Sequence, residues 1–143
     1  MESDRKLVEF MKPKSMGDRD WGEEILIALS PDNYTLKKLF IKAGKKGGLQ
    51  YHHLKDESGY VVFGSLIIRH DNGEGKLIET IVNEGESFRF PPNSVHQEEA
   101  ITDCLIIEAS TPHYNDRVRV ENEYGLKEEK GLASTKLSEV NKL

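Results

Sequence analysis

The sequence is poor in cysteine and in long apolar runs, and each shortage excludes a class of protein. Cys104 is the only cysteine among the 143 residues, so no disulfide can form within the chain. It lies in the apolar run 104–107, where a buried and unreactive side chain is expected. No apolar stretch approaches the roughly 20 residues that a membrane helix needs, and no basic-then-apolar leader opens the chain. We therefore expect a cytoplasmic location and no membrane partner.

The sequence also lacks a large excess of charge of one sign. Its 25 acidic and 20 basic residues are interspersed and give a net charge of −5. A protein that grips nucleic acid or an anionic membrane through charge usually has a basic surface instead. The charge pattern therefore favours a small soluble ligand as the partner and argues against nucleic acid.

Helix signals are scarce, whereas strand signals run through the middle of the chain. Short runs rich in Ile, Val, Phe and Tyr end about every ten residues at Gly, Asn, Asp or Pro, which is typical of an all-β sandwich or barrel. The segment 71–75 contains Asn and Gly residues that suit a hairpin turn. The predicted strands are 24–29, 34–42, 49–53, 59–69, 76–82, 87–90, 94–97 and 101–109.

The two ends of the chain are more polar than its middle. We expect an N-terminal arm at 1–19, a barrel at 20–125, and a polar C-terminal tail at 126–143. Ala, Leu, Glu and Lys at 133–142 would allow a short exposed helix, although the tail could equally be disordered.

Residues 44–64 combine side chains that can bind a metal. Side chains alternate along a strand, so Gln50 and His52 point to one face and His53 to the other. After a short turn, Glu57 can return to the first face. A lone histidine, His96, follows a proline-bounded bend at 85–96 and offers a fourth ligand. Imidazole, carboxylate and amide oxygen together suit a borderline or hard divalent ion.

These two segments resemble the two motifs of the cupin superfamily. The first has a glycine, five residues, a ligand pair at i and i+2, four residues, a glutamate, six residues and a glycine, with Gln50 in place of the usual first histidine. In the second, Asn93 takes the place of a glycine ahead of His96. The resemblance implies an all-β cupin double-stranded β-helix, a jelly-roll barrel. It also implies one divalent ion (Mn, Fe, Co, Ni or Zn) held by Gln50, His52, Glu57 and His96.

A closer resemblance extends over about residues 19–125, to the cupin domain of type II mannose-6-phosphate isomerases. The residues that carry it lie at 20–23, 49–53, 110–112 and 116–125, and that family also has glutamine in place of the first histidine. The resemblance implies a metal-dependent aldose–ketose isomerase that acts on a sugar phosphate or a related activated sugar. Leu54, Lys55 and the Ser-Gly pair after Glu57 depart from the isomerase pattern.

Within that interpretation, Glu57 is the candidate catalytic base, with a metal-bound hydroxide as its alternative. Arg119 and Lys55 are the candidates for binding substrate, with Arg119 preferred over Arg117 and Lys42 as the phosphate clamp. The departures around Glu57 leave a second function open, a non-catalytic sugar-binding or regulatory cupin that contains a metal. An iron-dependent dioxygenase ranks third. Because cupins commonly pair and the arm would suit strand exchange, we also expect a homodimer.

Overall fold

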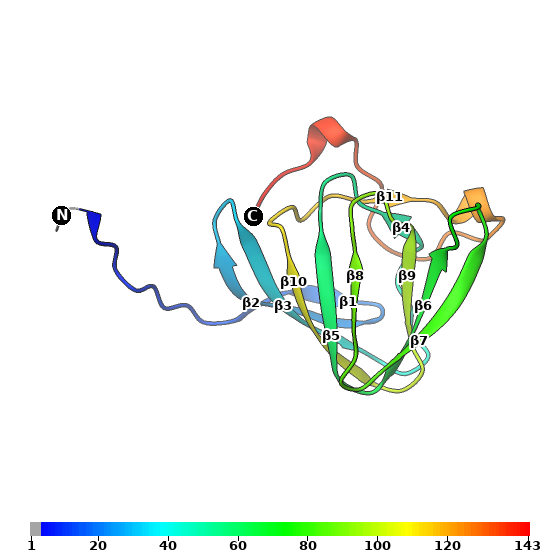
Figure 1. Cartoon of the computed structure of the whole chain (residues 1–143), viewed down its shortest axis with the longest axis horizontal. Coiled ribbons are helices and arrows are strands. Elements are labelled where there is room, and N and C mark those ends of the chain that lie inside the picture. Colours follow the sequence, from blue (N-terminus) through cyan, green and yellow to red (C-terminus); the bar gives the residue numbers. More distant parts are fainter. Residues whose placement is uncertain (1–3) are drawn as a thin grey trace.

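The computed structural model describes residues 4–143, which form two antiparallel sheets that face one another (Figure 1). The six-stranded sheet contains, in spatial order, β1 (Lys14–Arg19), β2 (Gly22–Ser30), β3 (Tyr34–Ile41), β10 (Cys104–Ser110), β5 (Glu57–Phe63) and β8 (Ser87–Phe90). The five-stranded sheet contains β11 (Val118–Arg119), β4 (Gln50–Tyr51), β9 (His96–Ala100), β6 (Ser65–Asp71) and β7 (Leu77–Asn83). Two single-turn helices follow, η2 (Glu121–Tyr124) and η3 (Leu137–Glu139). The all-β prediction is confirmed.

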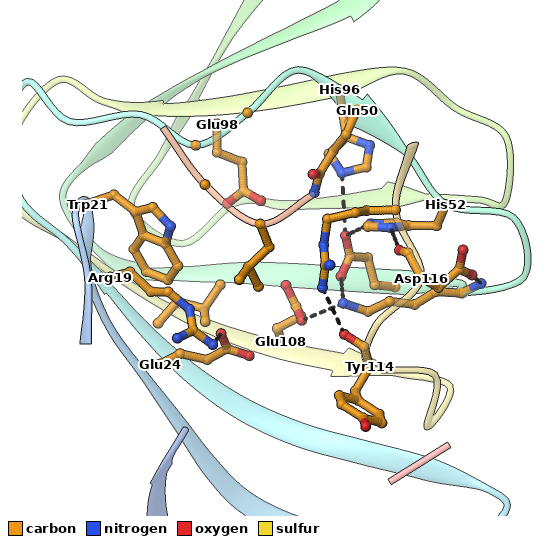
Figure 2. Close-up of a pocket in the computed structure, with 18 of the residues that line it drawn as sticks. Arg19, Trp21, Glu24, Gln50, His52, His96, Glu98, Glu108, Tyr114 and Asp116 are labelled. Atoms are coloured by element: carbon orange, nitrogen blue, oxygen red, sulfur yellow. Dashed lines mark hydrogen bonds and ion pairs between the residues drawn. The ribbon is translucent and has the colours of Figure 1, made fainter. Parts of the chain in front are cut away.

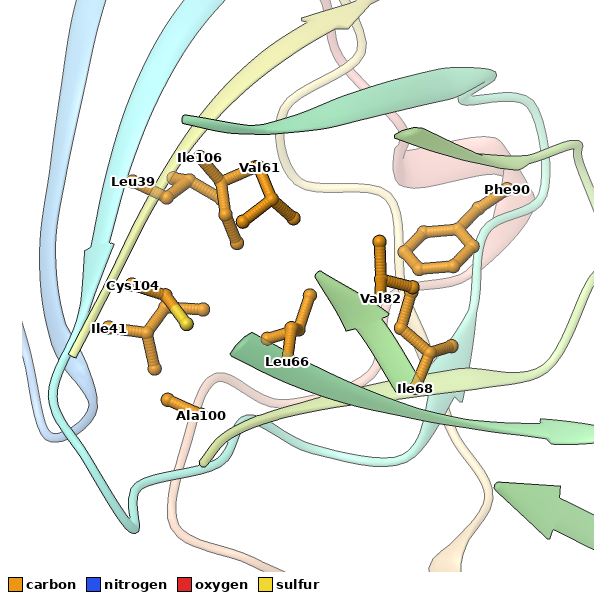
Figure 3. Packing of buried hydrophobic residues seen from close by; sticks show 10 residues of the cluster. All are labelled: Leu39, Ile41, Val61, Leu66, Ile68, Val82, Phe90, Ala100, Cys104 and Ile106. Atoms are coloured by element: carbon orange, nitrogen blue, oxygen red, sulfur yellow. The ribbon is translucent and has the colours of Figure 1, made fainter. Parts of the chain in front are cut away.

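The interior between the sheets changes from apolar to polar along the same strands. On β10 and β3 every second residue points inward. The antiparallel register places apolar residues of one strand opposite apolar residues of the other, and polar residues opposite polar ones. Ile106 faces Leu39 at the apolar end, whereas Glu108 faces Lys37 further along. The apolar half, shown in Figure 3, comprises Leu39, Ile41, Val61, Leu66, Ile68, Val82, Phe90, Ala100, Cys104 and Ile106. Cys104 is fully buried there.

The strand predicted for 59–69 is wrong, because the structure divides it at Gly64. β5 ends just before this residue in the six-stranded sheet, and β6 begins just after it in the other sheet. Gly64 has φ +92°, and a Cβ atom there would lie 2.2 Å from the carbonyl oxygen of Asp103. Only glycine permits this backbone, which carries the chain from one sheet to the other. The predicted hairpin at 71–75 does join β6 to β7.

Both ends of the chain contribute to the folded body. β1 lies within the predicted arm yet pairs with β2, so the sheet begins at Lys14 rather than near residue 20. The C-terminal segment returns to the barrel, where the amide of Thr135 donates to the carbonyl of Arg117 and that of Leu143 to the carbonyl of Pro112. The helix considered for 133–142 is reduced to η3. No helix within residues 4–143 is long and apolar enough to cross a membrane.

The arm ahead of β1 projects from the body and exposes apolar side chains (Figure 1). Leu7 and Phe10 are each 91% exposed, and on the outer side of β5 Tyr60 and Val62 are exposed as well. Apolar surfaces of this kind are where the homodimer, still a prediction, would form.

We expect the chain to sediment as a dimer at micromolar concentration. The double variant Leu7→Ser/Phe10→Ser should sediment as a monomer, because it removes the apolar area that the arm would bury. Glu9→Ser, an exposed polar change in the same arm, is the control and should remain dimeric. A monomeric wild-type chain, or a double variant that stays dimeric, would contradict the prediction.

Candidate metal centre

Three strand ends bring His52, Glu57 and His96 together in the polar half of the interior. Glu57 is the first residue of β5 and His96 the first of β9, while His52 directly follows β4. The register of β4 and β9 pairs Gln50 with His96, which places the first and last predicted ligands side by side. The predicted facing of His52 into the barrel and of His53 away from it agrees with their burial.

The geometry of these three side chains suits one metal ion. His52 Nε2 lies 3.1 Å from Glu57 Oε1, and His96 Nε2 lies 3.6 Å from the same oxygen. One ligand atom from each residue lies within 4.8 Å of the others, and the residues are only 3–4% exposed. Atoms that bind one ion at about 2.1 Å are themselves separated by roughly 3–3.5 Å. The residues therefore fit a divalent ion (Figure 2).

Hydrogen bonds orient both imidazole rings toward that position. His96 Nδ1 donates to the carbonyl of Ser94 at 2.9 Å, and His52 Nδ1 donates to the carbonyl of Asp116. With Nδ1 occupied in this way, Nε2 is left with a lone pair for a metal. The ring of Phe90 stacks on His96 with centroids 3.8 Å apart, which holds the imidazole plane from its other side.

Gln50 lies in the same pocket, beside His96 (Figure 2). Its position on β4 follows from the strand alternation, which puts it two residues before His52 on the inward face. Its role as the fourth ligand stays a prediction.

Glu57 is balanced by a buried lysine as well as by the two histidines. Lys55 Nζ lies 2.8 Å from Glu57 Oε2 and 3.6 Å from Glu108 Oε1. Burial alone would raise the pKa of Glu57, but the Lys55 ammonium and the His52 ring hold it well below its usual range. Burial also lowers the pKa of His96, to about 4. Both groups are thus in the deprotonated state that a metal requires at neutral pH.

Two acids in the pocket, Glu98 and Glu108, were missed from the sequence. Burial raises the pKa of Glu108 to about 8, and the charge of Glu57 adds to that effect. Burial likewise raises the pKa of Glu98 well above its usual range, and its Oε2 is buried without a hydrogen-bond partner. Strand alternation could have found them. Glu98 is two residues beyond His96 and so shares its face of β9, and Glu108 is two residues beyond the inward Ile106 on β10.

Both predicted substrate-binding residues line the cavity, Lys55 beside the metal ligands and Arg119 with its guanidinium already bonded to other groups of the chain. The Arg119 guanidinium forms an ion pair with Glu121 at 2.6 Å and donates to the main-chain carbonyls of Glu129 and Leu132. Arg117 donates in the same way to the carbonyls of Tyr114 and Ala133. Both arginines anchor the C-terminal segment, and binding of phosphate by Arg119 stays a prediction that would require these bonds to open.

A cavity of about 470 Å³ leads to the candidate metal ligands. Residues from both ends of the chain form part of its wall, including Arg19 and Trp21 from the N-terminal part and Lys130 from the C-terminal part. The segments predicted to be an arm and a tail therefore shape the pocket. This volume is in the range of sites that bind small molecules.

Comparisons with known proteins agree with this architecture. No family model matches the chain. Mannose-1-phosphate guanylyltransferase RfbM from Salmonella typhimurium is 29% identical over 138 residues, and the corresponding enzyme from Salmonella muenchen is 31% identical over 134. The matches cover 87% and 85% of this chain but only 28% and 27% of those proteins. The chain thus spans less than a third of the length of these relatives.

Solved structures show which fold the two sheets form. The capsular polysaccharide assembling protein CapF from Staphylococcus aureus superposes with a TM-score of 0.60 at 26% identity, over 69% of this chain and 30% of that one. An RmlC-like cupin from Shewanella frigidimarina superposes with a TM-score of 0.60 at 17% identity, over 76% and 92%. The chain has the cupin fold. In this fold, β5 and β9 and the residue after β4 present the three converging candidate ligands.

Metal removal and ligand substitution test the centre. We expect the purified cupin to bind one divalent ion per chain and His96→Ala or Glu57→Gln to lose it, because each change leaves at most two of the three converging ligands. Gln50→Ala should weaken binding less, since an amide is a weaker ligand. His70→Ala is the control, because in the wild type the imidazole of His70 bonds to Thr80 and does not line the cavity. Full metal occupancy in both His96→Ala and Glu57→Gln would exclude this site.

Proposed function

We propose that this cupin is a metal-dependent enzyme that interconverts an aldose and a ketose form of a sugar phosphate or a related activated sugar. The observation that carries the proposal is the buried His52, Glu57 and His96 set at the inner end of a cavity that also holds protonatable acids. The similarity to mannose-1-phosphate guanylyltransferases supports a phosphorylated or activated sugar as substrate.

Each polar side chain of the pocket has a part in this chemistry. A bound divalent ion would polarise the carbonyl and hydroxyl oxygens of the sugar and lower the cost of the negative charge that develops when a proton leaves carbon. Glu57 stays ionised and would hold the ion through the oxygen that faces the histidines. Lys55, beside it, can donate a hydrogen bond to a sugar oxygen.

The proton that moves between C1 and C2 needs a group that can both accept and donate it. Such a group works best when its pKa lies near the working pH. Glu108 satisfies this condition better than Glu57, because burial raises its pKa to about 8 while the pKa of Glu57 lies well below the usual range. Glu108 lies on the neighbouring strand β10 and borders the same cavity, so we assign it the proton transfer and assign Glu57 chiefly to the metal.

A cation at the cavity mouth is the natural place for the phosphate. Lys130 is largely exposed and lies 3.8 Å from Asp20, the loosest of the ion pairs among the residues that line the cavity. Arg19 borders the same opening but pairs with Glu24 at 3.1 Å. A phosphate held by Lys130 would leave the sugar ring directed toward the metal ligands.

A second candidate function is a metal-containing cupin that binds a sugar without converting it. The specific observation in its favour is the Lys55–Glu57 ion pair, because it occupies one oxygen of the carboxylate at the centre of the site. Its prediction differs from that of the enzyme in one respect, since the bound sugar would be recovered unchanged.

A substrate screen tests the proposal directly. The metal-loaded cupin, incubated with hexose and pentose phosphates, should interconvert at least one aldose–ketose pair, and chelation should abolish this conversion. Trp21 lines the cavity, so its fluorescence reports binding separately from turnover. A fluorescence change without conversion of the sugar would favour the binding protein. Absence of conversion with Mn, Fe, Co, Ni and Zn alike would exclude the isomerase.

Variants of the buried acids assign the proton transfer. Glu108→Gln should lower kcat by about 10²- to 10⁴-fold, the contribution of a general base, and should retain the metal. Glu57→Gln should lose metal and activity together. Glu99→Gln, on the outward side of β9, is the control and should keep both. Unchanged kcat in Glu108→Gln would return the proton transfer to Glu57 or to another group.

A further inference from the structure

Asp116 is a buried carboxylate on the segment between β10 and β11, and it contacts the loop that carries the metal ligands. It is only 2% exposed. Its Oδ1 accepts the main-chain N–H of His53 at 2.7 Å, and its Oδ2 accepts those of Leu54 at 2.7 Å and Lys55 at 2.8 Å. One side chain therefore holds three successive amides of the loop. Figure 2 shows Asp116 beside His52.

The main chain of Asp116 acts on the same loop. Its carbonyl oxygen accepts the hydrogen bond from His52 Nδ1 that directs His52 Nε2 toward Glu57. Asp116 thus sets both the orientation of the imidazole and the path of the backbone immediately after it.

Other bonds hold the two ends of the loop, where the carbonyl of His52 accepts from the amide of Asn93 and the main chain of Asp56 bonds to Thr111, whereas the amides of residues 53–55 between them bond to Asp116. Residues 52–56 lie between the two-residue strand β4 and the start of β5, outside any strand. In a sheet, these amides would donate hydrogen bonds to carbonyls of a neighbouring strand. Here three of them donate to the carboxylate of Asp116 instead. Charge-assisted hydrogen bonds of this kind are about twice as strong as neutral ones. The path of the chain between His52 and Glu57 is consequently fixed in part by a residue that lies 61 to 63 positions beyond these amides.

We propose that Asp116 is the positioning residue of the candidate metal centre: it holds residues 53–55 so that His52 and Glu57 converge on one ion. The inference rests on the metal-dependent function proposed above. It assigns to Asp116 no contact with metal or substrate, only control over the residues that make such contacts.

Metal affinity separates this role from a general contribution to stability. Asp116→Asn keeps the shape but turns an N–H donor toward the loop amides, so one or two of the three bonds are lost. Asp71→Asn is the matched control, because Asp71 also accepts main-chain N–H bonds, from Gly73 and Gly75, but does so at the β6–β7 turn away from the site. Both variants should lower the melting temperature of the metal-free chain.

Titration with Co²⁺, followed by visible absorption, is the decisive measurement. Asp116→Asn should bind Co²⁺ about 10- to 100-fold more weakly than the wild type, as expected for a partner behind the ligands, whereas Asp71→Asn should bind it with unchanged affinity. Excess Co²⁺ should restore the absorption spectrum of the wild type in Asp116→Asn. Equal affinity in Asp116→Asn and the wild type, or an equal loss in Asp71→Asn, would overturn the inference.

Two further results separate this inference from the proposed function. If the wild type binds Co²⁺ but converts no sugar phosphate, the isomerase proposal fails and the role of Asp116 stands. If the wild type binds no Co²⁺, the metal centre and the inference fall together. Should Asp116→Asn not fold, hydrogen exchange of the wild type serves instead. Amides of residues 53–55 that exchange as freely as the exposed arm at 4–13 would overturn the inference, and strong protection would support it.

Discussion

The carboxylate of Glu57 is a charge placed inside a protein, and the arrangement of the pocket follows from the need to balance it. An ionised group taken out of water costs several kcal/mol unless cations and hydrogen bonds compensate. Here Lys55 lies 2.8 Å from one oxygen, and His52 and His96 face the other. Lys55 therefore supplies the positive charge that makes burial of Glu57 possible, and an ion held by the two histidines would add a second one at the other oxygen.

The fold can tolerate this polar pocket because the remainder of the interior is apolar. The register of β3 and β10 places Leu39 opposite Ile106 and, two residues along, Lys37 opposite Glu108. Burial of a Val, Leu, Ile or Phe side chain contributes about 1.5–3 kcal/mol, and the eight such residues of the cluster in Figure 3 offset the cost of the charged end. In a barrel divided in this way, the apolar half provides the stability of the fold. The polar half can therefore keep a fixed geometry although burial of its charges costs free energy.

Much of this could be predicted from the sequence, and the errors have identifiable physical causes. Strand alternation and motif spacing are local, so His52, Glu57 and His96 were found, although their binding of metal stays a prediction. The break at Gly64 was missed because the apolar pattern continues across it, and only the close approach of Asp103 explains it. The ion pair that occupies Arg119 depends on how the C-terminal segment packs, which no local pattern encodes.

The two oxygens of Glu57 face different groups, and this arrangement decides whether Lys55 would compete with a metal for the carboxylate. Oε1 lies toward both histidines, whereas Oε2 lies toward the ammonium of Lys55. A carboxylate can serve one cation on each oxygen, so an ion bound by the histidines would leave the Lys55 contact in place. Lysine at position 55 is then compatible with a metal centre. The ammonium of Lys55 remains beside the metal ligands and close to Glu108, where it can donate a hydrogen bond to a ligand bound in the cavity.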